Sequence, residues 1–224
     1  IAGGSGDGTL GYYDQDCVDG GNSVATCRGS SNSAQIESVF GNQTLNFVSG
    51  GSLTITGGSV GSNNWAGIEN EAELAGNAQS INGNPNITLT GGSSGGKAIG
   101  APDDDFDLTN DAGIYNEGPG GQFITAGTLT INGSGNATTH GGAGISNDAT
   151  AGVLQITTTG DMSMYGGGSN VVHPYGAPVY IHSEGVPISL NVGGKLHVES
   201  GTGTSAPAII GSVDNSADVA ITAA

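Results

Sequence analysis

The sequence predicts an all-β fold: a right-handed, single-stranded parallel β-helix of about six coils, each with three short strands. A recurring pentapeptide, two further series of alternating apolar and polar residues, and glycine clusters between the runs all indicate this fold. Repeats with a period of about 20–50 residues are typical of solenoids, in which each repeat buries its apolar side against its neighbours.

The first strand of each coil is marked by the pentapeptide Ala-Gly-Ile-x-Asn, which starts at Ala66, Ala112 and Ala143. Looser copies occupy residues 34–38, 177–181 and 206–210, so units start at 34, 66, 112, 143, 177 and 206. Residues of equal phase in a parallel solenoid lie above one another, about 4.8 Å apart. We therefore expect the pentapeptide isoleucines to form one column around a common apolar axis.

Two other series supply the remaining strands. One series comprises 53–56, 87–90, 129–132, 162–165 and 196–199. Side chains alternate across a strand, so in this series the apolar members face inward and the Thr, Ser and His between them face outward. The other comprises Leu45 with Phe47, Ile81, Phe123 with Ile124, Leu154 with Ile156, Ile188 with Leu190, and Val219 with Ile221.

Glycine makes up 44 of the 224 residues and clusters between these runs, for example at 57–58 and 166–168. Tight corners often require a positive φ, which glycine adopts without steric penalty. A glycine-rich chain can also be disordered, but a disordered chain has no reason to keep its apolar residues in phase. We expect almost no helix.

The pentapeptide asparagines are predicted to stack. Asn70, Asn116 and Asn147 then form an amide ladder in which each side chain satisfies its neighbours' donors and acceptors. The alternative is three ordinary turn residues in left-handed geometry. In the last two units, 177–181 and 206–210, the same position falls on Ile181 and Ile210, where we expect apolar stacking instead.

The charge balance restricts the partners. Three Lys and Arg residues against 20 Asp and Glu give a net charge of −17, which excludes nucleic acid and anionic membrane as favourable partners. The sequence contains neither an apolar run of eighteen residues nor a leader peptide, so we expect no membrane insertion and a mature chain starting at Ile1; a fragment of a longer protein is the alternative. We expect an extracellular or cell-surface protein.

Residues 1–33 are predicted to form an N-terminal cap and residues 34–224 one continuous solenoid. Cys17 and Cys27, the only cysteines, are predicted to form a disulfide within the cap, which implies an oxidising compartment. Two free thiols are the alternative. A zinc site is disfavoured because no histidine lies nearby and the spacing is not Cys-x-x-Cys.

An insertion at 97–111 stretches the spacing between units from 32 to 46 residues and is rich in aspartate. Closely packed carboxylates repel one another unless a cation or solvent screens them, so the insertion is either a Ca²⁺ site or a solvated acidic loop. No other cofactor is expected. The candidate ligands are Asp103, Asp104, Asp105, Asp107 and Asp111.

We predict no catalytic residues. Lyases of this architecture use an Arg or Lys base and hydrolases use paired carboxylates. The basic residues Arg28, Lys97 and Lys195 are scattered, and the clearest outward carboxylates, Glu69 and Glu199, fall on different faces and distant coils.

A recognition face is the other candidate site. Tyr115 and Tyr180 share the fourth place of the pentapeptide and Trp65 precedes the same strand, so we expect an outward row of aromatic rings able to grip a glycan or a protein. Isolated exposed aromatics are the alternative. Glycosylation sequons begin at Asn42, Asn86, Asn132 and Asn136.

The chain resembles the right-handed β-helix exoproteins of bacteria, which are haemagglutinin-type and autotransporter passenger adhesins. Leu-Thr-Ile-Thr-Gly-Gly at 53–58 and Ile-Thr-Leu-Thr-Gly-Gly at 87–92 carry the resemblance, as does Gly-Thr-Leu-Thr-Ile at 127–131. Gly-Gly-Ala-Gly-Ile at 141–145 is similar to the Gly-Gly-Ala-Ile motif of polymorphic outer-membrane passengers, although the companion Phe-x-x-Asn motif does not recur.

Two functions fit this resemblance. The first is a secreted structural or adhesive solenoid. Its partner is either a further copy of itself, stacked end to end into a fibre or surface layer, or a glycan or protein of the host or cell surface. The alternative is a carbohydrate-binding or polysaccharide-active β-helix.

Overall fold

The structure is a computed structural model that describes residues 1–2, 34–59, 64–71, 76–93, 111–134, 141–149, 151–168, 177–202, 206–212 and 217–224. Every regular element in these ranges is a β-strand. None of the described segments forms a helix of the length and apolarity needed to cross a membrane. Several predictions fall outside these ranges: nearly all of the cap, Cys17 and Cys27, Asp103, Asp104, Asp105 and Asp107, and Asn136.

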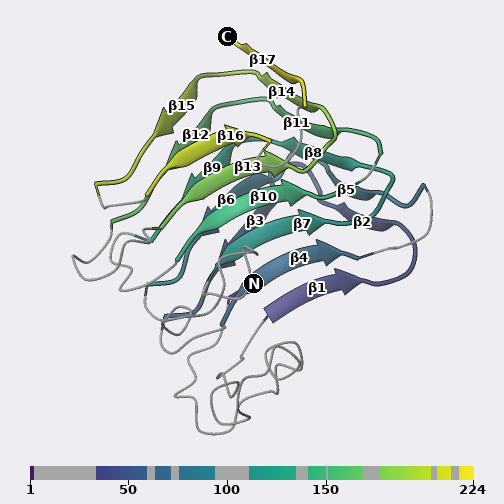
Figure 1. Cartoon of the computed structure of the whole chain (residues 1–224), viewed down its shortest axis with the longest axis horizontal. Coiled ribbons are helices and arrows are strands. Elements are labelled where there is room, and N and C mark those ends of the chain that lie inside the picture. Colours follow the sequence, from purple (N-terminus) through teal and green to yellow (C-terminus); the bar gives the residue numbers. More distant parts are fainter. Residues whose placement is uncertain are drawn as a thin grey trace, which may run out of the picture.

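Three parallel sheets run the length of the molecule (Figure 1). The first sheet contains β1 (Ala34–Ser38), β4 (Ala66–Asn70), β7 (Ala112–Asn116), β10 (Ala143–Asn147), β13 (Val179–Ser183) and β16 (Ala208–Gly211). The second contains β2 (Gln43–Asn46), β5 (Gln79–Asn82), β8 (Gln122–Ala126), β11 (Leu154–Thr158), β14 (Ile188–Val192) and β17 (Val219–Ala223). The third contains β3 (Ser52–Thr56), β6 (Asn86–Thr90), β9 (Leu129–Asn132), β12 (Met162–Tyr165) and β15 (Leu196–Glu199).

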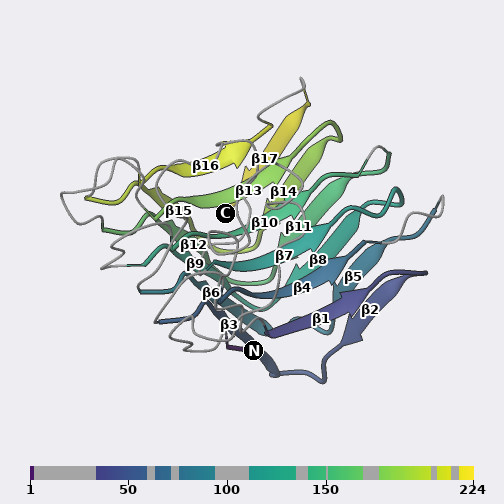
Figure 2. The ribbon, with the colours of Figure 1, turned by 60° about the horizontal axis from the view of Figure 1, so that its bottom comes forward.

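Consecutive strands therefore belong to different sheets, and each strand pairs with its equivalents three positions earlier and later in the chain. The predicted parallel β-solenoid is confirmed. The described strands make five complete three-strand coils and two strands of a sixth, slightly fewer than the predicted six coils of three. Figure 2 shows the sheets wrapped around one axis, with β1 at one end and β17 at the other.

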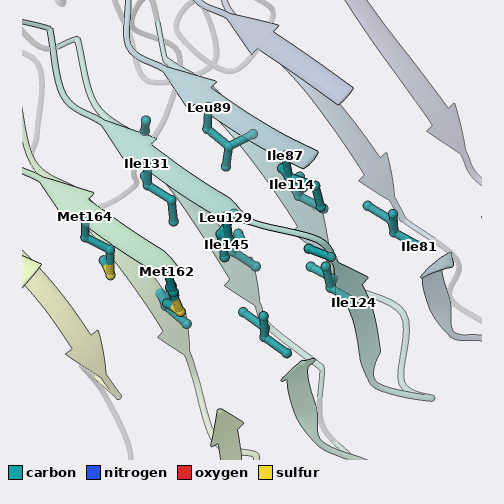
Figure 3. Packing of buried hydrophobic residues seen from close by; sticks show 14 of the residues in the cluster. Ile81, Ile87, Leu89, Ile114, Ile124, Leu129, Ile131, Ile145, Met162 and Met164 are labelled. Carbon is teal, nitrogen blue, oxygen red and sulfur yellow. The ribbon is translucent and has the colours of Figure 1, made fainter. Parts of the chain in front are cut away.

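The apolar axis is also confirmed. Ile68 pairs with Ile114, Ile114 pairs with Ile145, and all three side chains are fully buried. Ile131 and Met164 come from the third sheet, and they lie with Ile114 and Ile145 in one packed cluster (Figure 3). Each strand contributes alternate side chains to this core because its neighbours hold it in register over its whole length.

The predicted alignment of the last two units was wrong by two residues. Val179 pairs with Ala143, so Ile181 continues the isoleucine column and Ser183 takes the position of Asn147. Pro178 lacks an N–H and precedes the first paired residue of β13; its carbonyl accepts a hydrogen bond from the Ala143 N–H at 3.0 Å. The unit therefore starts at Val179. Ile181 and Ile210 pair with each other as an apolar stack, but they continue the isoleucine column and not the asparagine column as predicted.

Glycine is required sterically at some corners. A Cβ on Gly91 would overlap the backbone carbonyl of Gly141, because the two corners lie against each other. The turn from β5 to β6 uses Gly83 with φ 94° and Asn84 with φ 51°, conformations that other residues rarely adopt. The glycine clusters thus allow successive coils to approach at the strand spacing.

Candidate functional site

The outer face of the first sheet carries a column of three glycines. Gly67 pairs with Gly113, and Gly113 pairs with Gly144. A Cβ on any of the three would collide with an aromatic ring: Trp65 at Gly67, Tyr115 at Gly113 and Tyr180 at Gly144. The missing side chains therefore leave the space over the three glycines to these rings.

The three aromatic residues form one cluster, which we call the aromatic patch. Trp65 and Tyr115 meet edge to face, with ring centroids 6.3 Å apart. The hydroxyl oxygens of Tyr115 and Tyr180 are 3.3 Å apart. The predicted recognition residues are thus brought together, although Tyr180 lies in the column of Gly144 rather than that of Tyr115.

The aromatic patch is not the exposed row that the sequence predicted. Tyr180 is only 2% exposed, and burial raises the pKa of both tyrosine hydroxyls well above the usual value. The nearby Asp111 carboxylate raises the pKa of both further. Both hydroxyls therefore stay protonated at neutral pH and act as hydrogen-bond donors or acceptors rather than as bases.

A hydrogen-bonded chain of Asp148, Ser146 and His182 lies beside the aromatic patch. Ser146 and His182 follow Tyr115 in one outward column, because Ser146 pairs with both Tyr115 and His182. The Ser146 Oγ donates to Asp148 Oδ1 at 2.6 Å and lies 3.3 Å from His182 Nδ1. Burial raises the pKa of the Asp148 carboxyl, while the Ser146 hydrogen bond and the neighbouring His182 lower it, leaving it above the usual value.

This chain has the residue types of a nucleophilic site but not its order. In a serine nucleophile site the histidine lies between the serine and the carboxylate, so that it can take the serine proton. Here Ser146 lies in the middle, donates its hydrogen bond to Asp148, and is only 5% exposed. The arrangement ties β10 to β13 and leaves the Ser146 hydroxyl without access to a substrate.

Carboxylates gather at the first coils of the same sheet. Glu37 pairs directly with Glu69, and Gln35 Nε2 donates to the Glu37 carboxylate. Burial raises the pKa of Glu71, and the charge of Glu37 and a hydrogen bond to it raise it further. Glu199 lies far away on the third sheet, where it pairs with His197 at 2.9 Å. The two carboxylates that the sequence singled out therefore lie on different sheets, as expected.

Asp111 is the one candidate calcium ligand within the described residues. It lies just before β7, is 8% exposed, and its Oδ1 accepts a hydrogen bond from the Gly142 N–H at 2.6 Å. That bond ties the start of β7 to the corner before β10. No group of three or more His, Cys, Asp or Glu within the described ranges is arranged to hold a metal ion.

The predicted asparagine ladder is present and fully buried. Asn70 Nδ2 donates to Asn116 Oδ1, and Asn116 Nδ2 donates to Asn147 Oδ1, each at 2.7 Å. The alternative of three independent turn residues was therefore wrong.

A second ladder was missed by the sequence analysis. Gln79 Nε2 donates to Gln43 Oε1 at 2.7 Å, and Gln122 Nε2 donates to Gln79 Oε1 at 2.6 Å. These glutamines begin β2, β5 and β8 and face inward. The signal was available, because each glutamine lies two residues before an inward apolar residue. A search for apolar residues alone passes over it.

The described sequons differ in exposure. Asn42 and Asn86 are exposed, and each uses its side-chain oxygen as an acceptor, from Ala78 N and Thr128 Oγ1. Asn132 is half-buried in β9. Comparisons of the chain with protein-family models, with curated proteins and with solved structures find no match.

Proposed function

We propose that this protein is a structural or adhesive β-solenoid of the extracellular space or cell surface. The observation that carries the proposal is the unbroken register: every described strand pairs with the equivalent strand of at least one neighbouring coil. Such a stack gives an elongated solenoid whose three sheets run along its length. The resemblance to bacterial β-helix adhesins supports the same role.

The interior supports a load-carrying role as well. Two amide ladders cross successive coils near one corner of the rod, and they run in opposite directions. The asparagine amides donate toward the C-terminal coils, whereas the glutamine amides donate toward the N-terminal coils. These bonds supplement the backbone ladders and resist both slippage and separation of coils, because a shifted coil would leave buried amides without partners.

The outer polar groups favour structure over catalysis. The Ser146 hydroxyl and the Tyr180 ring are buried, and the Asp111 carboxylate binds backbone. General acid or base groups must reach a substrate proton within hydrogen-bonding distance. We therefore favour the structural role over a polysaccharide-active enzyme.

The first test is the location of the native protein. Immunogold electron microscopy of the producing cells should place it on the cell surface or in extracellular material. Labelling confined to the cell interior would contradict the proposal.

The second test addresses carbohydrate. A reducing-sugar assay on a panel of polysaccharides should stay blank. Release of sugar by the purified protein would replace the structural role with the enzymatic one. A glycan array separates adhesion from pure structure, with Trp65→Ala as the variant and Phe40→Ala, which alters an exposed ring outside the aromatic patch, as the control.

A further inference from the structure

The outer face of the third sheet carries a regular array of hydroxyl groups. Its strands β3, β6 and β9 lie next to one another (Figure 2). Thr54 pairs in register with Thr88, which pairs with Thr130, and a second column starts two residues later on each strand. We call these six outward positions the threonine face; they are Thr54, Thr56, Thr88, Thr90, Thr130 and Asn132.

The strand pairing fixes the spacing of these side chains in two directions. Neighbouring strands are about 4.8 Å apart, and alternate residues along a strand are about 6.6 Å apart. The inward residues between the two columns are Ile55, Leu89 and Ile131, and all three are fully buried. Because this packing holds the strands in place, the six groups form a fixed lattice rather than a set of independent side chains.

The preference of threonine for strands does not by itself explain the array. The second sheet has the same architecture, and one of its outward columns passes through Phe123, Gln155, Ser189 and Ala220. Those four side chains share neither size nor chemistry. The repetition of threonine is therefore a property of one face and not of every strand in this fold.

The protein itself does not use the side chains of the threonine face. Among the described residues, none of the six makes a side-chain hydrogen bond. Threonines elsewhere do: Thr125 Oγ1 donates to Ile81 O at 3.2 Å, and Thr158 Oγ1 donates to Gly160 O at 2.8 Å. A hydroxyl can donate and accept, so the hydroxyls of the threonine face can bond to water in either sense.

The threonine face is also uncharged, in a chain with a net charge of −17. Charged residues enter its columns only at the far end of the sheet, where His197 and Glu199 take the corresponding positions on β15. The face has no basic group to bind phosphate, and none of the Trp, Tyr or Arg side chains that usually anchor a protein partner. It matches an uncharged surface whose hydrogen-bonding groups repeat at fixed distances.

We propose that the threonine face binds ice. Water molecules at the surface of an ice crystal repeat at distances similar to the two spacings of the face, so both columns can bond to lattice waters at the same time. Liquid water has no such repeat. Each threonine also carries a methyl group, and contact with the crystal removes that apolar surface from liquid water.

The fixed lattice is what makes the binding effective. Each hydroxyl gains little by exchanging a liquid water molecule for one in the crystal. Six groups that are already held at matching distances act together, and they lose little conformational freedom on binding. Ice binding is a function beyond the proposed structural role, and it does not depend on that role.

The test observes ice in solutions of the full chain on a cold-stage microscope. We expect the natural chain to keep the grains of polycrystalline ice small and to give single crystals flat facets as they grow. Thr88→Lys places a long, charged side chain at the centre of the face. It should raise the protein concentration required for either effect at least about tenfold.

The matched control is Thr157→Lys, at a half-buried outward position of the second sheet. It changes the net charge by the same amount and should leave the effect on ice unchanged. Thr54→Lys, at an exposed position of the threonine face, repeats the test in case Thr88→Lys perturbs folding, which circular dichroism and thermal melting will check. Equal losses for Thr157→Lys and the two face variants would overturn the inference, as would a natural chain that leaves ice growth unchanged at every concentration.

Crystalline polysaccharide is the other periodic surface to test. We expect the natural chain to stay in solution when it is mixed with insoluble cellulose or chitin. Retention on either polymer that Thr88→Lys abolishes and Thr157→Lys preserves would assign the face to a glycan and overturn the ice proposal. Labelling of the native protein at the cell surface would still support the structural role in that case.

Discussion

One corner of the solenoid is built in two ways along its length. Between the first and second sheets, the early coils place amides in the interior: Asn70 beside Gln79, then Asn116 beside Gln122. In the later coils Ser183 continues the asparagine column, and an apolar run that begins at Leu154 continues the glutamine column. Both versions are fully buried. The comparison shows that continuity along a column matters more than its polarity.

Where the amide columns end, buried polar atoms are left without hydrogen-bond partners. Gln122 pairs in register with Leu154, and no described residue offers a hydrogen bond to Gln122 Oε1. Asn147 Nδ2 is likewise buried and unpaired below Ser183. Inside a ladder each amide satisfies its neighbours, so the unfavourable energy of burying polar groups concentrates at the ladder ends.

Interrupting a ladder should have the largest effect. Gln79→Leu orphans the Gln43 acceptor and a Gln122 donor in the interior, and we expect it to lower the free energy of unfolding by about 4 kcal/mol. Urea denaturation followed by circular dichroism measures this. The control is the triple variant Gln43→Leu, Gln79→Leu and Gln122→Leu, which removes all three ladder amides together and leaves none of them orphaned. If the triple variant loses more free energy of unfolding than Gln79→Leu alone, the three amides do not act as a coupled unit.

Extending a ladder should be far milder than inserting an isolated amide. Leu154→Gln places a donor next to Gln122 Oε1, so we expect a loss of only about 1 kcal/mol. Ile156→Gln, on the same strand and equally buried, has an apolar column above and below it and should lose about 3 kcal/mol. The same denaturation measurement compares the two variants. Equal losses would show that the corner does not distinguish a ladder from an apolar column.

The serine that ends the asparagine column should matter less than an asparagine within it. Ser183 Oγ donates to Val186 O at 2.7 Å and accepts from Val186 N at 3.1 Å, so it closes its own turn and bridges no coils. We expect Ser183→Ala to cost about 1 kcal/mol and Asn116→Ala about 3 kcal/mol. Thermal melting of the two variants tests the difference. A larger shift for Ser183→Ala would contradict the distinction.

The sequence predicted the early coils better than the later ones, and the reason is local. The pentapeptide keeps glycine in second place and asparagine in fifth in three early units, which fixed both the register and the ladder. In the fifth unit Ala177 and Pro178 imitate the start of that motif two residues early. A shift of two residues leaves Val179 and Ile181 on the inward face, so the alternation of side chains does not distinguish the two alignments. The pairing of Val179 with Ala143 does.

The aromatic patch shows a different limit. The sequence identified Trp65, Tyr115 and Tyr180 as a group, but a strand pattern says only that a side chain points outward. Whether the ring then projects into solvent or packs against the sheet depends on the side chains of the neighbouring coil. Gly144 lies next to Tyr180 across the sheet but 36 residues away in the chain, so sequence spacing does not reveal that the Tyr180 ring packs over this glycine.

The smallest effect on stability should come from changing a carboxylate on the outside of the early coils, whose interior holds neutral amides. The raised pKa of Glu71 means that the folded protein holds this proton more tightly than the unfolded chain. Its contribution to stability is therefore present below the pKa of an unfolded glutamate, about 4.3, and is lost as the pH rises through the higher folded value. Glu71→Gln removes that loss.

At neutral pH Glu71→Gln should be more stable than the natural chain by at most about 0.5 kcal/mol, because the side chain is largely solvated and water screens its repulsion from Glu37. The gain should disappear in acid. Thermal melting from pH 3 to pH 8 measures the difference, with Glu184→Gln, an exposed glutamate beyond β13, as the control. A gain in stability that is independent of pH would show that the charge of Glu71 is not its cause, and would remove this contrast with the neutral amides of the interior.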